Sequence, residues 1–229
     1  MRLYSGRVKE IQLPHQGWQS AWIACPPGAV PAPGQYLQAF DPAAGLAPLA
    51  ASLFPAAYAD GCFLAAAPVP EEWLPGTSLR LRGPLGRGFH LPPTAHRVAL
   101  GIFGDELGRL LPVVDAAGKG QADVALFTDL PLPRLPASVE VRPLASLPEA
   151  PGWADWLALD LPLEALAGLR ACLGLAPRMR LACAAQALIH TAMPCSGIGT
   201  CGACAVPHRQ GWKLACKDGP VFDLDQLEW

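Results

Sequence analysis

The C-terminal tail contains the stretch that decides how this chain is organised: Met193-Pro194-Cys195-Ser196-Gly197-Ile198-Gly199-Thr200-Cys201-Gly202-Ala203-Cys204, followed by Trp212-Lys213-Leu214-Ala215-Cys216. Its cysteines follow the pattern Cys-x5-Cys-x2-Cys-x11-Cys. Thiolates are soft, anionic ligands suited to iron-sulfur chemistry. Three thiolates in one loop and a fourth from a later strand match the ligand arrangement of plant-type ferredoxins, whose first spacing is usually x4. The pattern therefore predicts a 2Fe-2S cluster on four ligands: Cys195, Cys201, Cys204 and Cys216.

The loop also contains three glycines that favour an iron-sulfur cluster. Gly197, Gly199 and Gly202 let the backbone bend tightly, with amide groups turned toward the sulfurs of a cluster. Such hydrogen bonds raise a cluster's reduction potential. Because the loops of the tail are short and rich in glycine, we expect the metal to organise this part of the chain.

Two other readings of the cysteines stay open. A structural zinc site usually takes two Cys-x2-Cys pairs, whereas here only Cys201 and Cys204 form one. The four cysteines could also be unligated. The remaining cysteines have no mutual spacing that suggests a site, so we expect them to be buried packing residues: Cys25, Cys62, Cys172 and Cys183.

Composition and charge narrow the class of protein. The 229 residues are 52% hydrophobic and 16% charged, which is ample for buried cores. A net charge of -2 gives no general basic field, so nucleic acid and membrane surfaces are poor partners. The first residues lack the continuous apolar core of a signal peptide, and no stretch is long and apolar enough to span a bilayer. We therefore expect a cytoplasmic protein, in which cysteines are more readily metal ligands than disulfides.

Residues 1–93 alternate short β-prone runs with Pro/Gly breaks and are predicted to form a small antiparallel β-barrel of the flavin-binding type. Four runs are expected as strands: Val8–Leu13, Trp18–Ala24, Tyr36–Phe40 and Ser78–Arg82. The 26 prolines and 23 glycines of the chain support many short strands joined by turns.

In residues 94–178, apolar runs alternate with helix-compatible segments. This part of the chain is therefore predicted to form a parallel α/β lobe of the nucleotide-binding type. The expected strands are His96–Phe103, Asp123–Thr128, Val139–Leu144 and Trp156–Leu161, and the expected helices are Asp105–Ala117 and Leu163–Leu173. Residues 179–229 then make a C-terminal cluster-binding domain.

Three motifs in order along the chain resemble the electron-transfer subunit of NAD-linked dihydroorotate dehydrogenase. They are Pro33-Gly34-Gln35-Tyr36, then Gly83-Pro84-Leu85-Gly86-Arg87-Gly88-Phe89, then the cysteine loop continued by Cys216-Lys217-Asp218-Gly219-Pro220-Val221-Phe222. The motif in the tail is specific for this family, whereas Pro33-Gly34-Gln35-Tyr36 alone is weak evidence for it. The resemblance implies a ferredoxin-reductase-like layout of barrel, nucleotide lobe and cluster domain. It also implies that NADH reduces FAD between the lobes and that the cluster passes single electrons to a catalytic partner containing FMN.

The FAD motif of that family is degenerate here. Its members usually carry Arg-Pro-x-Ser after the first motif, and the matching stretch in this chain is Leu49-Ala50-Ala51-Ser52. Only Ser52 is retained as a candidate cofactor-binding residue. Loss of a guanidinium that can grip phosphate bidentately removes the strongest reason to expect tight FAD binding. Forms with and without FAD therefore both stay open.

The nucleotide lobe departs further from the family pattern. After the strand near Leu100 the chain runs Gly101-Ile102-Phe103-Gly104-Asp105-Glu106-Leu107-Gly108, which is not Gly-x-Gly-x-x-Gly. Asp105 and Glu106 are expected at the positive end of a helix, where they would repel a pyrophosphate. A Cys-Gly-Pro motif of the family is replaced by Asp160-Leu161-Pro162. These losses predict that NAD is not bound.

The sequence as a whole predicts an electron-transfer subunit of a dihydroorotate-dehydrogenase-type complex, in hetero-oligomeric contact with a catalytic flavoprotein. No catalytic residue is assigned, because no Ser/His/Asp set, paired carboxylates or phosphate loop occurs. Alternatives are an iron-sulfur relay of another oxidoreductase without FAD, and a scaffold subunit whose tail is stapled by metal.

Overall fold

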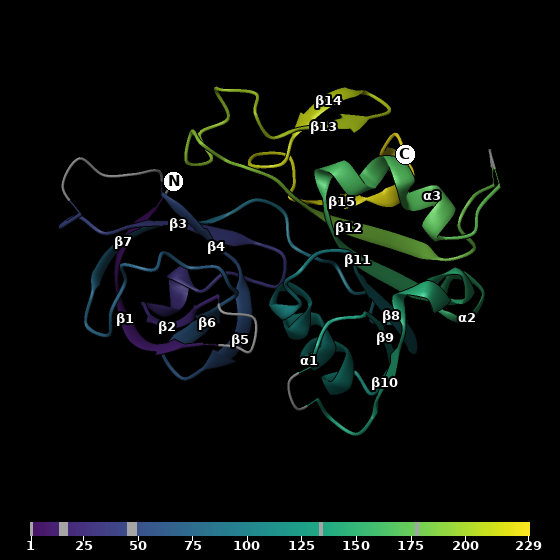
Figure 1. The fold of residues 1–229 in the computed structure, drawn as a ribbon, viewed down its shortest axis with the longest axis horizontal. Coiled ribbons are helices and arrows are strands. Elements are labelled where there is room, and N and C mark those ends of the chain that lie inside the picture. Colours follow the sequence, from purple (N-terminus) through teal and green to yellow (C-terminus); the bar gives the residue numbers. More distant parts are fainter. Residues whose placement is uncertain (1, 14–17, 45–49, 133–134, 177–178) are drawn as a thin grey trace.

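The computed structural model describes residues 2–13, 18–44, 50–132, 135–176 and 179–229. Two sheets lie side by side, and a small hairpin lies above the second one (Figure 1). Leu49, at the start of the degenerate FAD motif, lies outside the described residues. No helix in the described part of the chain has the length and apolar character needed to cross a bilayer.

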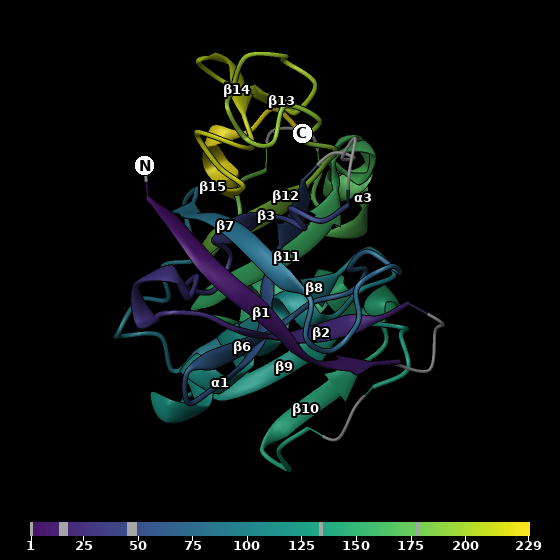
Figure 2. The ribbon, with the colours of Figure 1, turned by 90° about the vertical axis from the view of Figure 1, so that its left-hand side faces the viewer.

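The first sheet is antiparallel, with the strand order β4-β3-β7-β1-β2-β6-β5. Its strands are β1 (Leu3–Gln12), β2 (Ser20–Ala24), β3 (Tyr36–Phe40), β4 (Ala51–Leu53), β5 (Pro55–Ala59), β6 (Cys62–Ala65) and β7 (Ser78–Leu85). Apolar side chains at alternate positions, such as Leu79 and Leu81 of β7, fill its interior. In Figure 2 the long strand β1 runs across the face of this curled sheet. The predicted antiparallel barrel is confirmed.

The second sheet has the order β10-β9-β8-β11-β12-β15, and all its pairs are parallel except β12 with β15. Its strands are β8 (Arg97–Ile102), β9 (Asp123–Phe127), β10 (Val139–Arg142), β11 (Trp156–Pro162), β12 (Ala184–His190) and β15 (Val221–Asp223). Every residue of β11 except Pro162 is buried, as expected for a strand covered on both faces. The predicted α/β lobe is confirmed.

Short helices cover both faces of this sheet. They are η2 (Gly108–Leu110), α1 (Leu111–Lys119), η3 (Leu144–Glu149), α2 (Ala150–Trp153), η4 (Leu163–Gly168), α3 (Leu169–Cys172) and η5 (Leu224–Gln226), and η1 (Pro27–Ala29) belongs to the barrel. The predicted helix Asp105–Ala117 begins too early, because the α-helix starts at Leu111. Pro112 explains the difference, since proline has no N–H to donate and fits only the first turn of a helix.

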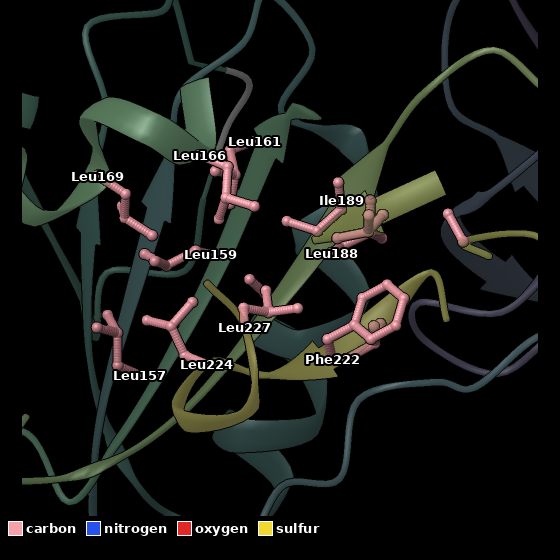
Figure 3. Close-up of a cluster of buried hydrophobic side chains, with 14 of the residues drawn as sticks. Leu157, Leu159, Leu161, Leu166, Leu169, Leu188, Ile189, Phe222, Leu224 and Leu227 are labelled. Atoms are coloured by element: carbon pink, nitrogen blue, oxygen red, sulfur yellow. The ribbon is translucent and has the colours of Figure 1, made fainter. Parts of the chain in front are cut away.

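The tail contributes strands to the second sheet. The chain leaves the sheet after β12, forms a loop and the hairpin β13 (Ala205–His208) with β14 (Gly211–Leu214), and returns as β15. Side chains of this excursion, including Met193 and Val206, join the core of the sheet. Figure 3 shows the centre of that core, where leucines of β11 meet Leu224 and Leu227 from the end of the chain. The excursion is therefore anchored at both ends.

The cysteines outside the predicted ligand set differ in exposure. Cys25 and Cys62 are buried, as predicted for packing residues. Cys183 is half-buried. Cys172 is exposed at the end of α3, so the prediction of a buried packing residue is wrong at this position.

Candidate metal centre

The four predicted ligands occupy the excursion between β12 and β15. Cys195 is half-buried and Cys201 exposed, whereas Cys204 and Cys216 are buried at the base of the hairpin. The side chains form two hydrogen-bonded pairs, Cys195 with Cys201 and Cys204 with Cys216. The charge on Cys216 is also sensitive to the other three thiols. The fold thus brings the four side chains into one neighbourhood.

The environments of two of these thiols shift their pKa values in opposite directions. Backbone N–H groups of Thr200 and Gly199 donate to the sulfur of Cys195 and, with the thiol of Cys201, lower its pKa to about 6. Burial, followed by the neighbouring thiol of Cys204, raises the pKa of Cys216 to about 12. Four adjacent thiolates repel one another, so a cation must be present for all of them to be deprotonated together.

The loop is built as a close-fitting cradle. Ser196, Gly197, Gly199 and Gly202 all have positive φ, between 53° and 82°. A Cβ added to Gly197 would lie 2.6 Å from the hydroxyl of Tyr36, so no side chain fits at this position. N–H donors turned toward a cysteine sulfur and backbone folded this tightly fit an iron-sulfur cluster.

A single-ion site has a different geometry. In the described ranges, no three His, Cys, Asp or Glu side chains converge on a point where one metal ion could be held. The cysteine ligands of a 2Fe-2S cluster are instead shared between two irons. That the four cysteines hold such a cluster stays a prediction.

The barrel supports the centre from below through Tyr36 at the start of β3. This fully buried side chain donates a hydrogen bond of 2.7 Å from its hydroxyl to the carbonyl oxygen of Cys216. Burial, and then the charge of the neighbouring Cys216, raises the pKa of the Tyr36 hydroxyl. The phenol therefore stays protonated and acts as a donor.

The three motifs that carried the resemblance meet around Gly219 and Pro220. A Cβ on Gly86 would lie 2.6 Å from the carbonyl oxygen of Gly219, and one on Gly34 would lie 2.6 Å from Val221. The N–H of Phe89 donates to the carbonyl of Pro33 over 2.9 Å. Glycine at these positions lets barrel and tail approach closely.

Ser52, the retained residue of the FAD motif, lies on β4 and is half-buried. It accepts a hydrogen bond of 2.7 Å from Nε2 of Gln38 and lies 4.0 Å from the sulfur of Met193. Tyr36 and Phe54 of the barrel belong to the same apolar cluster as Met193. The hydroxyl is thus engaged within the protein, and its role toward a cofactor is a prediction.

The carboxyl edge of the parallel sheet, where nucleotides bind in folds of this type, contains a buried ion pair. Arg109 Nε lies 2.8 Å from Asp160 Oδ2, and the two side chains are 8% and 1% exposed. Arg109 Nη2, Asp160 Oδ1 and His190 Nε2 are buried beside them without a hydrogen-bond partner among the described residues. Sequence reasoning did not identify Arg109. A signal for it was present in the sequence, because the carboxylate of Asp160 lies inside the apolar strand β11. A buried carboxylate requires a cationic partner.

Neighbouring groups at this edge are also desolvated. Burial raises the pKa of Glu106, whose carboxylate accepts a hydrogen bond from the N–H of Gly108. Burial, followed by the charge of Arg109, lowers the pKa of His190. The helical segment begins at Gly108 as η2 and continues as α1 from Leu111, so Asp105 and Glu106 precede it, outside the helix that was expected to start at Asp105. The carboxylate of Glu106 accepts from the first N–H of this segment, as expected for an acidic group at its positive end.

Comparison with known proteins agrees with this description. Residues 190–228 match the family model described as the iron-sulfur cluster binding domain of dihydroorotate dehydrogenase B. No curated protein sequence matches the chain.

The whole fold has solved counterparts. A chain of the NADH-dependent reduced ferredoxin-NADP oxidoreductase, reported for flavin-based electron bifurcation, superposes with a TM-score of 0.75 at 16% identity, over 98% of this chain and 90% of that one. The ferredoxin reductase of carbazole 1,9a-dioxygenase superposes with a TM-score of 0.60 at 20% identity, over 76% and 65%. The resemblance drawn from the sequence is confirmed: the chain has a ferredoxin-reductase-like fold, and its C-terminal residues 190–228 match the dihydroorotate dehydrogenase B iron-sulfur model.

Proposed function

We propose that this chain is the electron-transfer subunit of an oxidoreductase complex and that it holds a 2Fe-2S cluster on Cys195, Cys201, Cys204 and Cys216. The observation that carries the proposal is the meeting of these four side chains under a glycine-rich loop. When bound, such a cluster accepts and donates single electrons. The chain's own residues position it and exclude water from its inner side, where Cys204 and Cys216 are buried.

The proposed partner is a catalytic flavoprotein of the dihydroorotate dehydrogenase type. Support comes from the name of the family whose model matches residues 190–228 and from the three motifs that surround Gly219. Cys201 is exposed, which leaves one end of the cluster site open to a second protein. The subunit would then form a hetero-oligomer.

We further propose that this subunit does not oxidise NADH. The carboxyl edge of its parallel sheet is filled by the buried pair Arg109–Asp160, and the first N–H of η2 already has the carboxylate of Glu106 as its acceptor. A dinucleotide pyrophosphate needs free N–H donors at this place.

An iron-sulfur relay without FAD is the second candidate. It is supported by the contacts of Ser52 with Gln38 and Met193 and by the apolar cluster that spans barrel and second lobe. The resemblance implies a flavin between the barrel and the second lobe, and this apolar cluster joins those two parts directly.

The deciding experiment is to purify the chain with its co-purifying partner and to measure iron, acid-labile sulfide, zinc, FAD and FMN. We expect about two irons and two sulfides per chain, and an electron paramagnetic resonance signal after dithionite reduction. Zinc in place of iron would reject the relay. Rapid bleaching of a bound flavin by stoichiometric NADH under anaerobic conditions would reject the claim that NADH is not oxidised.

A further inference from the structure

A row of polar side chains crosses the barrel strands below the loop that contains Cys195, Cys201 and Cys204, which is called the cluster loop. Ser52 on β4, Gln38 on β3 and Arg82 on β7 occupy directly paired positions, because Gln38 pairs with both of the others. Paired residues of antiparallel strands point to the same face of the sheet. Gln38 is fully buried and Arg82 is 7% exposed. This polar row therefore lies inside the molecule.

The polar row contacts the loop on both sides of a predicted ligand. Ser52 Oγ lies 4.0 Å from the sulfur of Met193, two residues before Cys195. A Cβ built on Gly197, two residues after Cys195, would lie 3.2 Å from Arg82 Nη2. The two ends of the row thus bracket Cys195.

Arg82 also lies close to a group that contacts a second predicted ligand. The Cβ position of Gly197 that lies 3.2 Å from Arg82 Nη2 lies 2.6 Å from the hydroxyl of Tyr36, which donates to the carbonyl oxygen of Cys216. A guanidinium is protonated at any pH at which the protein is folded. Arg82 is buried, so water screens its charge little. The charge therefore affects groups several ångströms away more strongly than a surface charge would.

The consequence for a bound cluster follows from charge. Two ferric ions with two sulfides and four thiolates carry a net negative charge, and one-electron reduction adds one more negative charge. A nearby buried cation stabilises the reduced form more than the oxidised form. It therefore raises the reduction potential, as net charge and hydrogen bonds generally do for iron-sulfur clusters.

We propose that Arg82 is a positioning residue that raises the reduction potential of the cluster, and that Gln38 and Ser52 hold the loop at Met193 in the same polar row. The inference rests on the proposed cluster at the four cysteines. It gives Ser52 a role toward the cluster loop in place of the predicted role toward FAD. It also accounts for a buried charge on the face of β7 opposite to the apolar interior positions Leu79 and Leu81, since Arg82 is buried on that face whereas Arg80 is exposed.

The test compares neutral and charged substitutions in the cluster-loaded full chain. In a mediated dithionite titration followed by electron paramagnetic resonance, we expect Arg82→Met to lower the equilibrium constant for reduction about tenfold, a shift of about 59 mV for a one-electron couple. Arg82→Lys keeps the charge and is expected to stay close to the unmodified protein. Arg80→Met is the matched control, because Arg80 lies on the same strand with its side chain in solvent.

Each outcome decides the matter. An unchanged potential in Arg82→Met, or equal shifts in Arg80→Met and Arg82→Met, would overturn the proposal. If Arg82→Met does not retain iron, Arg82→Gln carries the same test, since it keeps a polar side chain without the charge. Absence of iron from the unmodified chain would instead reject the proposed function, so the two failures are distinguishable.

Discussion

Two loops of this chain follow the carboxyl ends of parallel strands, and they treat their backbone donors in opposite ways. The loop after β12 turns the N–H groups of Gly199 and Thr200 toward the sulfur of Cys195. In the loop after β8, the carboxylate of Glu106 accepts from Gly108, and a buried ion pair occupies the edge of the sheet. The first loop offers its donors to an anionic group, and the second uses them internally. Within one ferredoxin-reductase-like fold, the two loops therefore differ in whether their N–H donors face a cysteine sulfur or a carboxylate of the chain itself.

The largest effect is expected from removing a buried ligand of the first loop. Cys216→Ser replaces a soft thiolate by a hydroxyl that binds iron poorly, so we expect loss of essentially all cluster iron. Iron and sulfide analysis with the visible spectrum measures this. Cys172→Ser changes an exposed cysteine outside the predicted ligand set and serves as the control. Full iron occupancy in Cys216→Ser would show that the cluster lies elsewhere.

The next largest effect is expected from breaking the buried ion pair between Arg109 and Asp160 at the carboxyl edge of the parallel sheet. Asp160→Ala leaves the guanidinium of Arg109 buried without its counter-charge, and we expect a loss of ~3–5 kcal/mol in the free energy of unfolding. Urea unfolding of the loaded protein measures it. The double variant Arg109→Met with Asp160→Leu removes both charges and should recover most of this loss. A double variant as unstable as Asp160→Ala would mean that the edge needs the charges themselves.

A smaller effect separates backbone strain from steric fit in the cluster loop. Gly197 and Gly202 have nearly the same φ, 72° and 73°, but a Cβ would meet Tyr36 at Gly197 and nothing within 4 Å at Gly202. Alanine costs ~1–2 kcal/mol at either position because of the left-handed φ. Gly197→Ala should cost a further ~1–3 kcal/mol through the clash. Thermal unfolding and the rate of iron loss to a chelator compare the two variants. Equal losses would remove the role given to Tyr36.

The sequence allowed prediction of those features that depend on neighbours along the chain. Alternation and Pro/Gly breaks placed strands such as Tyr36–Phe40, and the continuous apolar run Trp156–Leu161 indicated a buried parallel strand. The cysteine spacing predicts a metal site because three of the four predicted ligands lie within ten residues. Pro112 is a local signal for the start of α1, because proline fits only the first turn of a helix.

Features that depend on tertiary approach could not be predicted. Nothing local indicates that β15 returns beside β12, or that Arg82 and Tyr36 of the barrel lie under Gly197. The partner of Asp160 is 51 residues away along the chain. In these cases a buried polar residue signals that a partner exists, and only the fold identifies it.

The smallest effect concerns a second ion pair on the same sheet, at the opposite end of β8, and it sharpens the contrast with the buried one. Arg97 and Asp155 lie 2.8 Å apart but are 49% and 32% exposed. The hydrogen bond from the side chain of Arg97, and then those from backbone N–H groups, lower the pKa of Asp155. A lowered pKa means that the contribution to stability is present above the pKa of the unfolded chain and is lost as pH falls through the folded value.

Asp155→Asn should therefore cost only a small fraction of the effect of Asp160→Ala at neutral pH, because solvent screens the exposed pair. The difference from the unmodified protein should shrink further as the pH is lowered through the acidic range. Urea unfolding of both proteins at several pH values measures it. A loss of stability as large as that of Asp160→Ala would show that burial does not account for the difference between the two ion pairs. The buried pair at the carboxyl edge would then stabilise the fold no more than the exposed pair does.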